Sequence, residues 1–166
     1  MTLSVLAILL AIAAPSFSTW IERWRVNRAA ADLESTLYFA RAEAIRHGGG
    51  VSLVRNSGSS MNCTAASDEW QCGWDLVIDR DGNGMPDSGT AAIQTTAALS
   101  NVVIKATKDS DAIFIDRWGV MQLADNSQIF HFTARPASQS NVDGPKVCIK
   151  PGGNVQKTKP ATNCPN

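Results

Sequence analysis

The sequence lacks an excess of charge of either sign. Fifteen Lys and Arg residues balance fifteen Asp and Glu residues, and the pI is near 6.7. A protein that coats nucleic acid through its overall field would be strongly basic, so that class is excluded, although a local basic patch is not. Charged residues make up only 18% of the 166 residues and apolar residues 44%, which favours one folded domain with a core over a disordered chain.

Motifs of catalysis are also absent. The sequence has no Gly-x-Ser-x-Gly elbow, no phosphate-binding Walker loop and no dinucleotide fingerprint. The two histidines have no recognisable nucleophile beside them: His47 precedes a glycine turn, and His131 alternates with Phe130 and Phe132 as on a strand. We therefore predict no catalytic residue, no metal site and no cofactor, and we expect the five tryptophans to pack in the core.

No charged residue precedes Glu22. Residues 3–14 contain only one polar side chain, that of Ser4. A helix needs roughly 20 apolar residues to cross a bilayer, so this run allows three interpretations. It is the core of a signal peptide with the small residues Ala11 and Ala13 at a cleavage site, a buried core helix, or part of a longer membrane segment. The pattern alone does not choose, although no Lys or Arg precedes the run as in a signal peptide.

Four cysteines form two local groups, Cys63 with Cys72 and Cys148 with Cys164. Four cysteines allow three pairings, and the local one is favoured because it closes the shortest loops. Zinc binding is the competing interpretation, but the sequence has neither a Cys-x-x-Cys nor a His-x-His cluster. Two disulfides would place the folded domain in the periplasm or outside the cell.

A helical pattern follows Pro15. Apolar residues recur mostly every three or four positions from Trp20 and Trp24 to Ala44, with charged residues between them. Three glycines from Gly48 end the pattern. Together with the apolar run, this predicts one helix of about 45 residues that is interrupted only at Pro15, where a backbone donor is missing.

Short apolar segments separated by turn residues fill the rest of the chain. They are residues 51–54, 74–78, 102–104, 112–115, 120–123, 128–132 and 146–149. No helical pattern lies between them, so the strands need no parallel crossovers. The predicted fold class is α+β, with a long N-terminal helix packed on an antiparallel β domain of about six to seven strands in one sheet or two. We divide the chain into a hydrophobic half-helix, 1–19, and a globular domain, 20–166, with an amphipathic helix at 20–47 and a β domain at 51–166.

Four stretches match one protein family in the expected order. They are the apolar run from Leu6 to Phe17, the pattern Leu33-x-x-x-Leu37-x-x-Ala40-Arg41-x-Glu43, the stretch Gly73-Trp74 to Gly84, and the closing segment Val147 to Val155. The sequence therefore resembles type IV pilins and pseudopilins, specifically the minor pilins of the FimT, FimU and GspH group. The family's basic leader and its Gly-Phe-Thr-Leu-x-Glu cleavage site are not present, so we interpret the chain as N-terminally truncated.

The resemblance implies a structural minor pilin of a type IV pilus that contributes to pilus initiation or tip assembly. A DNA-binding minor pilin for natural transformation and a minor pseudopilin of type II secretion are the alternatives. The implied partners are other major and minor pilins through the N-terminal helix. The implied location is the inner membrane, single-pass with a periplasmic globular domain, and then the pilus or pseudopilus. The filament-core residues would be Leu6, Leu9, Leu10, Ile12 and Pro15.

An acidic segment from Asp79 to Asp87 has oxygen side chains at positions 1, 3, 5 and 9 and Gly84 at position 6, as in a calcium loop. Position 12 is Thr90 and not the bidentate Glu of such loops, and no helices flank the segment. The favoured alternative is a hairpin turn stabilised by bonds from Asp and Asn side chains to the backbone.

Beyond Asp143 the chain has four lysines and no acidic residue. Of these, Lys150, Lys157 and Lys159 are the candidates for a weak, salt-sensitive DNA contact. Some FimT-like proteins bind DNA through a Gly-Arg-x-Arg hairpin, and here the matching stretch from Gly153 has Asn and Gln in place of both arginines. A solvated tail tethered by Cys148 and Cys164 is the favoured interpretation.

Overall fold

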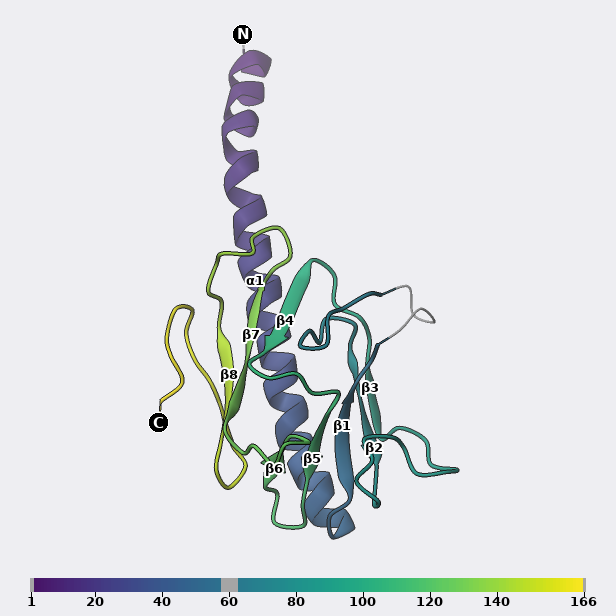
Figure 1. The fold of residues 1–166 in the computed structure, drawn as a ribbon. Helices are drawn as coiled ribbons and strands as arrows, with labels where there is room; N and C mark the ends of the chain where they lie inside the picture. The colour runs from purple at the N-terminus through teal and green to yellow at the C-terminus, as the bar shows by residue number, and fades with distance from the viewer. Residues whose placement is uncertain (1, 58–62, 166) are drawn as a thin grey trace.

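One long helix dominates the computed structural model, which describes the backbone of residues 2–57 and 63–165 and the side chains of 18–57 and 63–165. Helix α1 (Thr2–His47) runs through Pro15 without the interruption that we expected there. Its N-terminal half extends away from the strands, and its C-terminal half lies along them (Figure 1). The side chains of Leu6, Leu9, Leu10, Ile12 and Pro15 lie outside the described residues. A search of the described residues for a helix of sufficient length and hydropathy to span a bilayer finds none.

The second half of α1 buries one face against the strands. The side chains on this face are at most 4% exposed and include Val26, Ala29, Leu33, Leu37 and Ala40. Trp20 and Trp24, which we expected on the same face, are 62% and 52% exposed. The expectation was wrong because Trp24 precedes Leu33 by nine positions, about two and a half turns, which places the two on opposite sides of the helix. The predicted helix end is confirmed, since α1 stops at His47 and Gly48 has a φ of 76°.

Nine strands form two antiparallel sheets in the described residues. The first sheet has the order β3-β2-β1-β5-β6, and the second has the order β4-β7-β8-β9. The strands of the first sheet are β1 (Val51–Arg55), β2 (Trp74–Ile78), β3 (Gln94–Thr96), β5 (Ala112–Ile115) and β6 (Met121–Gln122). Those of the second are β4 (Val102–Ala106), β7 (Phe130–Pro136), β8 (Lys146–Lys150) and β9 (Asn154–Lys157). The α+β class is confirmed, with more strands than the six to seven expected.

The core lies between α1 and the inner faces of both sheets. Trp70 and Trp74 are fully buried, as expected of packing residues, and Trp70 meets Phe132 edge-on with ring centroids 5.2 Å apart. The structure pairs Cys63 with Cys72 and Cys148 with Cys164, which is the local pairing favoured from the sequence. The first disulfide closes the loop before β2, and the second ties the C-terminal segment to β8. Each disulfide therefore fixes a segment without regular structure to a part of the chain that packs in the core.

Candidate interaction surfaces

Side chains of α1 bind the outer edge of β9. The carboxylate of Glu34 accepts the backbone N–H of Lys157 at 2.9 Å, and Arg41 donates to the carbonyl of Gly153 at 2.9 Å. Between them the Tyr38 hydroxyl donates to the carbonyl of Val155. An unpaired strand edge is a template for pairing with another chain, and here the helix occupies it. The β8–β9 hairpin is therefore fixed to the helix and does not offer an open edge to a partner.

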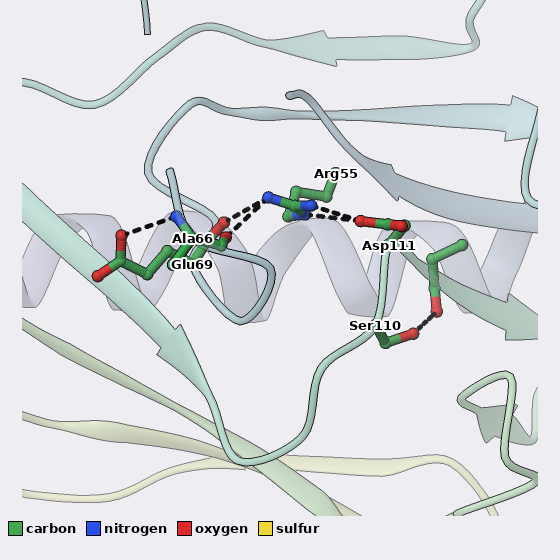
Figure 2. A network of polar contacts seen from close by, with 6 residues as sticks. Arg55, Ala66, Glu69, Ser110 and Asp111 are labelled. Carbon is green, nitrogen blue, oxygen red and sulfur yellow. Dashed lines mark hydrogen bonds and ion pairs between the residues drawn. The ribbon is translucent and has the colours of Figure 1, made fainter. Parts of the chain in front are cut away.

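A buried arginine anchors the loop that the Cys63–Cys72 disulfide closes. Figure 2 shows Arg55, at the end of β1, between this loop and Asp111. Its guanidinium donates to the carbonyls of Ala66 at 2.9 Å and Glu69 at 3.3 Å, and it forms an ion pair with Asp111. The side chain of Arg55 is 7% exposed and that of Asp111 is 78% exposed, so the arginine is buried in this ion pair while its carboxylate partner stays in solvent. Sequence reasoning missed this residue because nothing distinguished it from a solvent-facing Arg at a strand end.

Hydrogen bonds to Gln71 and the backbone of Ala66 hold the Glu69 carboxylate in the same loop. Gln71 donates to this carboxylate at 2.8 Å and the Ala66 N–H at 3.2 Å. The bond from Gln71 is the largest cause that holds the pKa of Glu69 below its ordinary value, and the bond from Ala66 adds to it against the opposing effect of burial. The Glu69 carboxylate is therefore held by polar groups of its own loop, and Arg55 holds the loop's carbonyls from outside, which is the arrangement of a structural anchor.

The acidic segment after β2 folds as a turn. One carboxylate oxygen from each of three residues lies within 4.8 Å of the others: Asp79, Asp81 and Asp87. Asp79 is buried, and its Oδ1 accepts the backbone N–H of Asn83 at 3.0 Å. Its Oδ2 accepts the backbone N–H of Gly84 at 3.0 Å and the hydroxyl of Ser52 at 2.6 Å. These are the side-chain bonds of a stabilised turn, which was the favoured interpretation of this segment.

The structure does not gather the three candidate lysines into one site. Lys150 lines a cavity of about 540 Å³ over the outer face of β7 and β8, together with Lys108 and His131. Lys157 lies on β9 beside α1, and Lys159 follows in the C-terminal segment; neither lines this cavity. On the β8–β9 ladder Lys157 pairs with Val147, three positions from Lys150, so the two lysines do not share one register position. The DNA contact and the solvated tail both stay predictions.

Charge in this cavity is partly neutralised. Lys108 donates to the Asp125 carboxylate at 2.7 Å, and this bond, with those from Ser127, lowers the pKa of Asp125 to about 2. Burial holds the pKa of His131 below its ordinary 6.5, and the positive charge of Lys146 lowers it further. His131 is therefore favoured in its neutral form, so that Lys150 is the lining residue left to supply a positive charge.

Three tryptophans lie on the surface, contrary to the expectation that all five pack in the core. Trp20 and Trp24 are exposed on α1, and Trp118 is 72% exposed in the turn between β5 and β6. The Arg28 guanidinium lies 5.4 Å from the ring centroid of Trp24, and the Arg117 guanidinium 5.5 Å from that of Trp118. The β5–β6 turn lies beside the C-terminal end of α1 in Figure 1, so the two Arg–Trp pairs are at opposite ends of the folded domain.

The family model of the type II transport protein GspH matches residues 29–153, about three quarters of the chain. The chain belongs to the GspH family. A search of curated proteins with this sequence finds no match.

Two crystal structures of the type IV minor pilin FimU from Pseudomonas aeruginosa PAO1 have a similar fold. One aligns with a TM-score of 0.57 at 16% identity, over 80% of this chain and 91% of FimU. The other aligns with a TM-score of 0.59 at 17% identity, over 82% of this chain and 90% of FimU. At this identity the likeness establishes a shared fold, so this GspH-family chain has the fold of a type IV minor pilin.

Proposed function

We propose that the protein is a structural, non-catalytic minor pilin of a type IV pilus that contributes to pilus initiation or tip assembly. The observation that carries the proposal is helix α1. Its 46 residues continue far beyond the sheets that bury its second half. A helix without tertiary packing is marginal in water, so the projecting half of α1 needs an environment of its own. Neighbouring pilin helices in the filament, and the inner membrane before assembly, would supply it.

A second feature of α1 supports contact with other subunits. Phe39 and Ile45 are 40% and 54% exposed and lie outside the face of the helix that packs on the strands. Large apolar side chains in such a position bury their surface when another helix packs on them. The proposal therefore divides the helix lengthwise, with one face for the domain's own core and the remaining surface for subunits beside it.

Photo-crosslinking tests this division. A photoreactive phenylalanine analogue at Phe39 would form adducts with other pilin subunits in piliated cells of the source bacterium. The same analogue at Ile129, which is 70% exposed but lies on a cavity wall of the second sheet, is the matched control. Adducts of pilin mass from position 39 and none from position 129 are expected. Equal adducts from both positions, or none from position 39, would contradict the proposal.

A minor pseudopilin of type II secretion is the second candidate, and the description of the matching family as a type II transport protein favours it. The two candidates share the fold and differ in the machine that the helix joins. Deletion of the gene separates them. Loss of surface pili with normal protein secretion supports the pilus, whereas loss of secretion with normal pili supports the pseudopilus.

A further inference from the structure

The first turns of α1 whose side chains the structure describes combine exposed aromatic rings with a cluster of arginines. Trp20 and Trp24 are the aromatic members, and Arg23, Arg25 and Arg28 are the cationic ones, all exposed. We propose that residues 20–28, here named the interface segment, bind the anionic headgroups of a phospholipid bilayer. The inference rests on the proposed membrane-held stage, and it assigns headgroup binding to side chains outside the apolar run.

The position of the interface segment fits the headgroup layer. An α-helix rises 1.5 Å per residue, so Trp20 lies about 5 Å and Trp24 about 10 Å beyond Phe17, where the apolar run ends. The polar layer on each side of the hydrocarbon is about 5–8 Å thick. Tryptophan concentrates in this layer because its ring is apolar and its N–H needs a polar partner. Trp20 is therefore at the depth where a bilayer holds tryptophan. The backbone of Trp24 is just beyond this layer, but helical side chains point back toward the N-terminus, which directs its ring toward the headgroups.

The charge of the interface segment is complementary to anionic lipid. Arg23 and Arg25 flank Trp24 in the sequence, and Arg28 lies over its ring. Long arginine side chains can extend along a helix to reach phosphate groups while their stems cover apolar surface.

The nearby carboxylates do not cancel this charge. Glu22 accepts hydrogen bonds from Ser138 at 3.1 Å and Gln139 at 3.3 Å in the loop between β7 and β8. Asp32 pairs with Arg28 at 3.7 Å, at the end of the segment nearer the strands. Within residues 20–28 three arginines outnumber the one carboxylate of Glu22, which leaves a net charge of +2 (3 − 1).

The chain provides its own control. Trp118 with Arg117 repeats the exposed Arg–Trp pair near the C-terminal end of α1. Gly49, two residues beyond the end of α1, lies against this pair, since a Cβ at Gly49 would be 3.1 Å from the backbone nitrogen of Arg117. Trp20 and Gly49 are separated by most of the described amphipathic helix, about 40 Å along its axis. A bilayer that holds the apolar run therefore meets the interface segment and not the Trp118 pair.

Fluorescence quenching in vesicles tests the inference with the full chain. The protein is reconstituted into vesicles of phosphatidylethanolamine and phosphatidylglycerol that contain a lipid with a quencher at headgroup depth. Quenching in the native chain and in Trp118→Phe should be equal, and it should be lost in the double variant Trp20→Phe, Trp24→Phe. The buried Trp70 and Trp74 give a constant unquenched background in all three proteins.

Arginine variants test the choice of anionic lipid. Each basic residue near an anionic surface strengthens binding on the order of fivefold at low salt. The triple variant Arg23→Gln, Arg25→Gln, Arg28→Gln should lower the preference for vesicles with phosphatidylglycerol over vesicles of phosphatidylcholine at least roughly tenfold. Arg117→Gln should leave this preference unchanged, and added salt should remove it from the native chain.

The outcomes separate this inference from the proposed function. One outcome is that the chain inserts so that it resists alkaline extraction while Trp20 and Trp24 are not quenched. This result overturns the inference on headgroup binding but leaves the proposed membrane-held stage intact. Failure of the chain to insert into either vesicle contradicts both. A change in Trp20 and Trp24 fluorescence that follows protein concentration and not lipid overturns the inference in favour of contact with a second copy of the chain.

Discussion

Two adjacent glycines in the β8–β9 turn offer a matched pair of substitutions. Gly152 and Gly153 have φ values of 80° and 73°, so both are in the left-handed region. They differ in what a side chain would meet. A Cβ at Gly152 would have nothing within 4 Å, whereas a Cβ at Gly153 would lie 1.9 Å from the carbonyl oxygen of Gly119. Gly153 is thus the point at which the hairpin of the second sheet touches the β5–β6 turn of the first.

The expected costs follow from these two environments. Gly152→Ala brings only the backbone strain of a left-handed alanine, about 1 kcal/mol in the free energy of unfolding. Gly153→Ala brings the same strain and a contact with backbone that must move, for which overpacking costs roughly 1–3 kcal/mol more. Arg41 donates to the carbonyl of Gly153, so a shift of the hairpin also disturbs its attachment to α1. We expect a total of about 2–4 kcal/mol for Gly153→Ala.

Urea unfolding with both disulfides intact measures the two costs. The unfolding free energy of Gly153→Ala should fall below that of Gly152→Ala by at least about 1 kcal/mol, which corresponds to a difference of roughly 2–4 °C in the thermal midpoint. Gly152→Ala serves as the control, because it carries the backbone strain without the contact. Equal stability of the two variants would refute the claim that close backbone contact at Gly153 joins the sheets.

Three further perturbations test other parts of the structure. Arg55→Met leaves the carbonyl of Glu69 without its donor and removes one of two donors from the carbonyl of Ala66, so the unfolding free energy should fall by about 1–3 kcal/mol, with partial recovery in Arg55→Lys; an unchanged midpoint in urea would refute the anchoring role. Because the pKa of His131 is lowered in the fold, stability should be full above pH 6.5 and decrease as pH falls through the lowered value, and His131→Gln should remove this dependence in thermal melts. Replacing Cys148 and Cys164 by Ser should cost about 3 kcal/mol by calorimetry, and no loss would contradict the tethering of the C-terminal segment.

Periodicity predicted the parts of the fold in which burial repeats regularly. The Leu33 and Leu37 face of α1 and the helix end at Gly48 follow directly from spacing and glycine chemistry. Trp20 and Trp24 were placed wrongly because they also recur every four residues. Such spacing shows that two residues share one face of a helix, but it does not show whether that face is the one that Leu33 and Leu37 occupy. Apolar character alone therefore did not separate a core face from an exposed one on this helix.

The strands that the apolar pattern missed have polar sequences; the region of β9 was expected only from the family resemblance of the closing segment from Val147 to Val155. Strand β3 is Gln-Thr-Thr, and strand β9 has only Val155 as a buried side chain. These strands form because a neighbouring strand and, for β9, the side chains Glu34 and Tyr38 supply hydrogen-bond partners. The network at Arg55 was missed for the same reason, since its partners come from segments distant in sequence. Such contacts are tertiary and leave no local pattern.

The most direct test of the central proposal is the protein's presence in the filament. Pili sheared from cells of the source bacterium are purified and digested, and peptides of the β domain are quantified by mass spectrometry against an equal preparation from a deletion strain. The account predicts that the protein co-purifies with the pili in small amounts and that the deletion strain has fewer pili per cell. Pili that lack the protein, with unchanged numbers after deletion, would contradict the account.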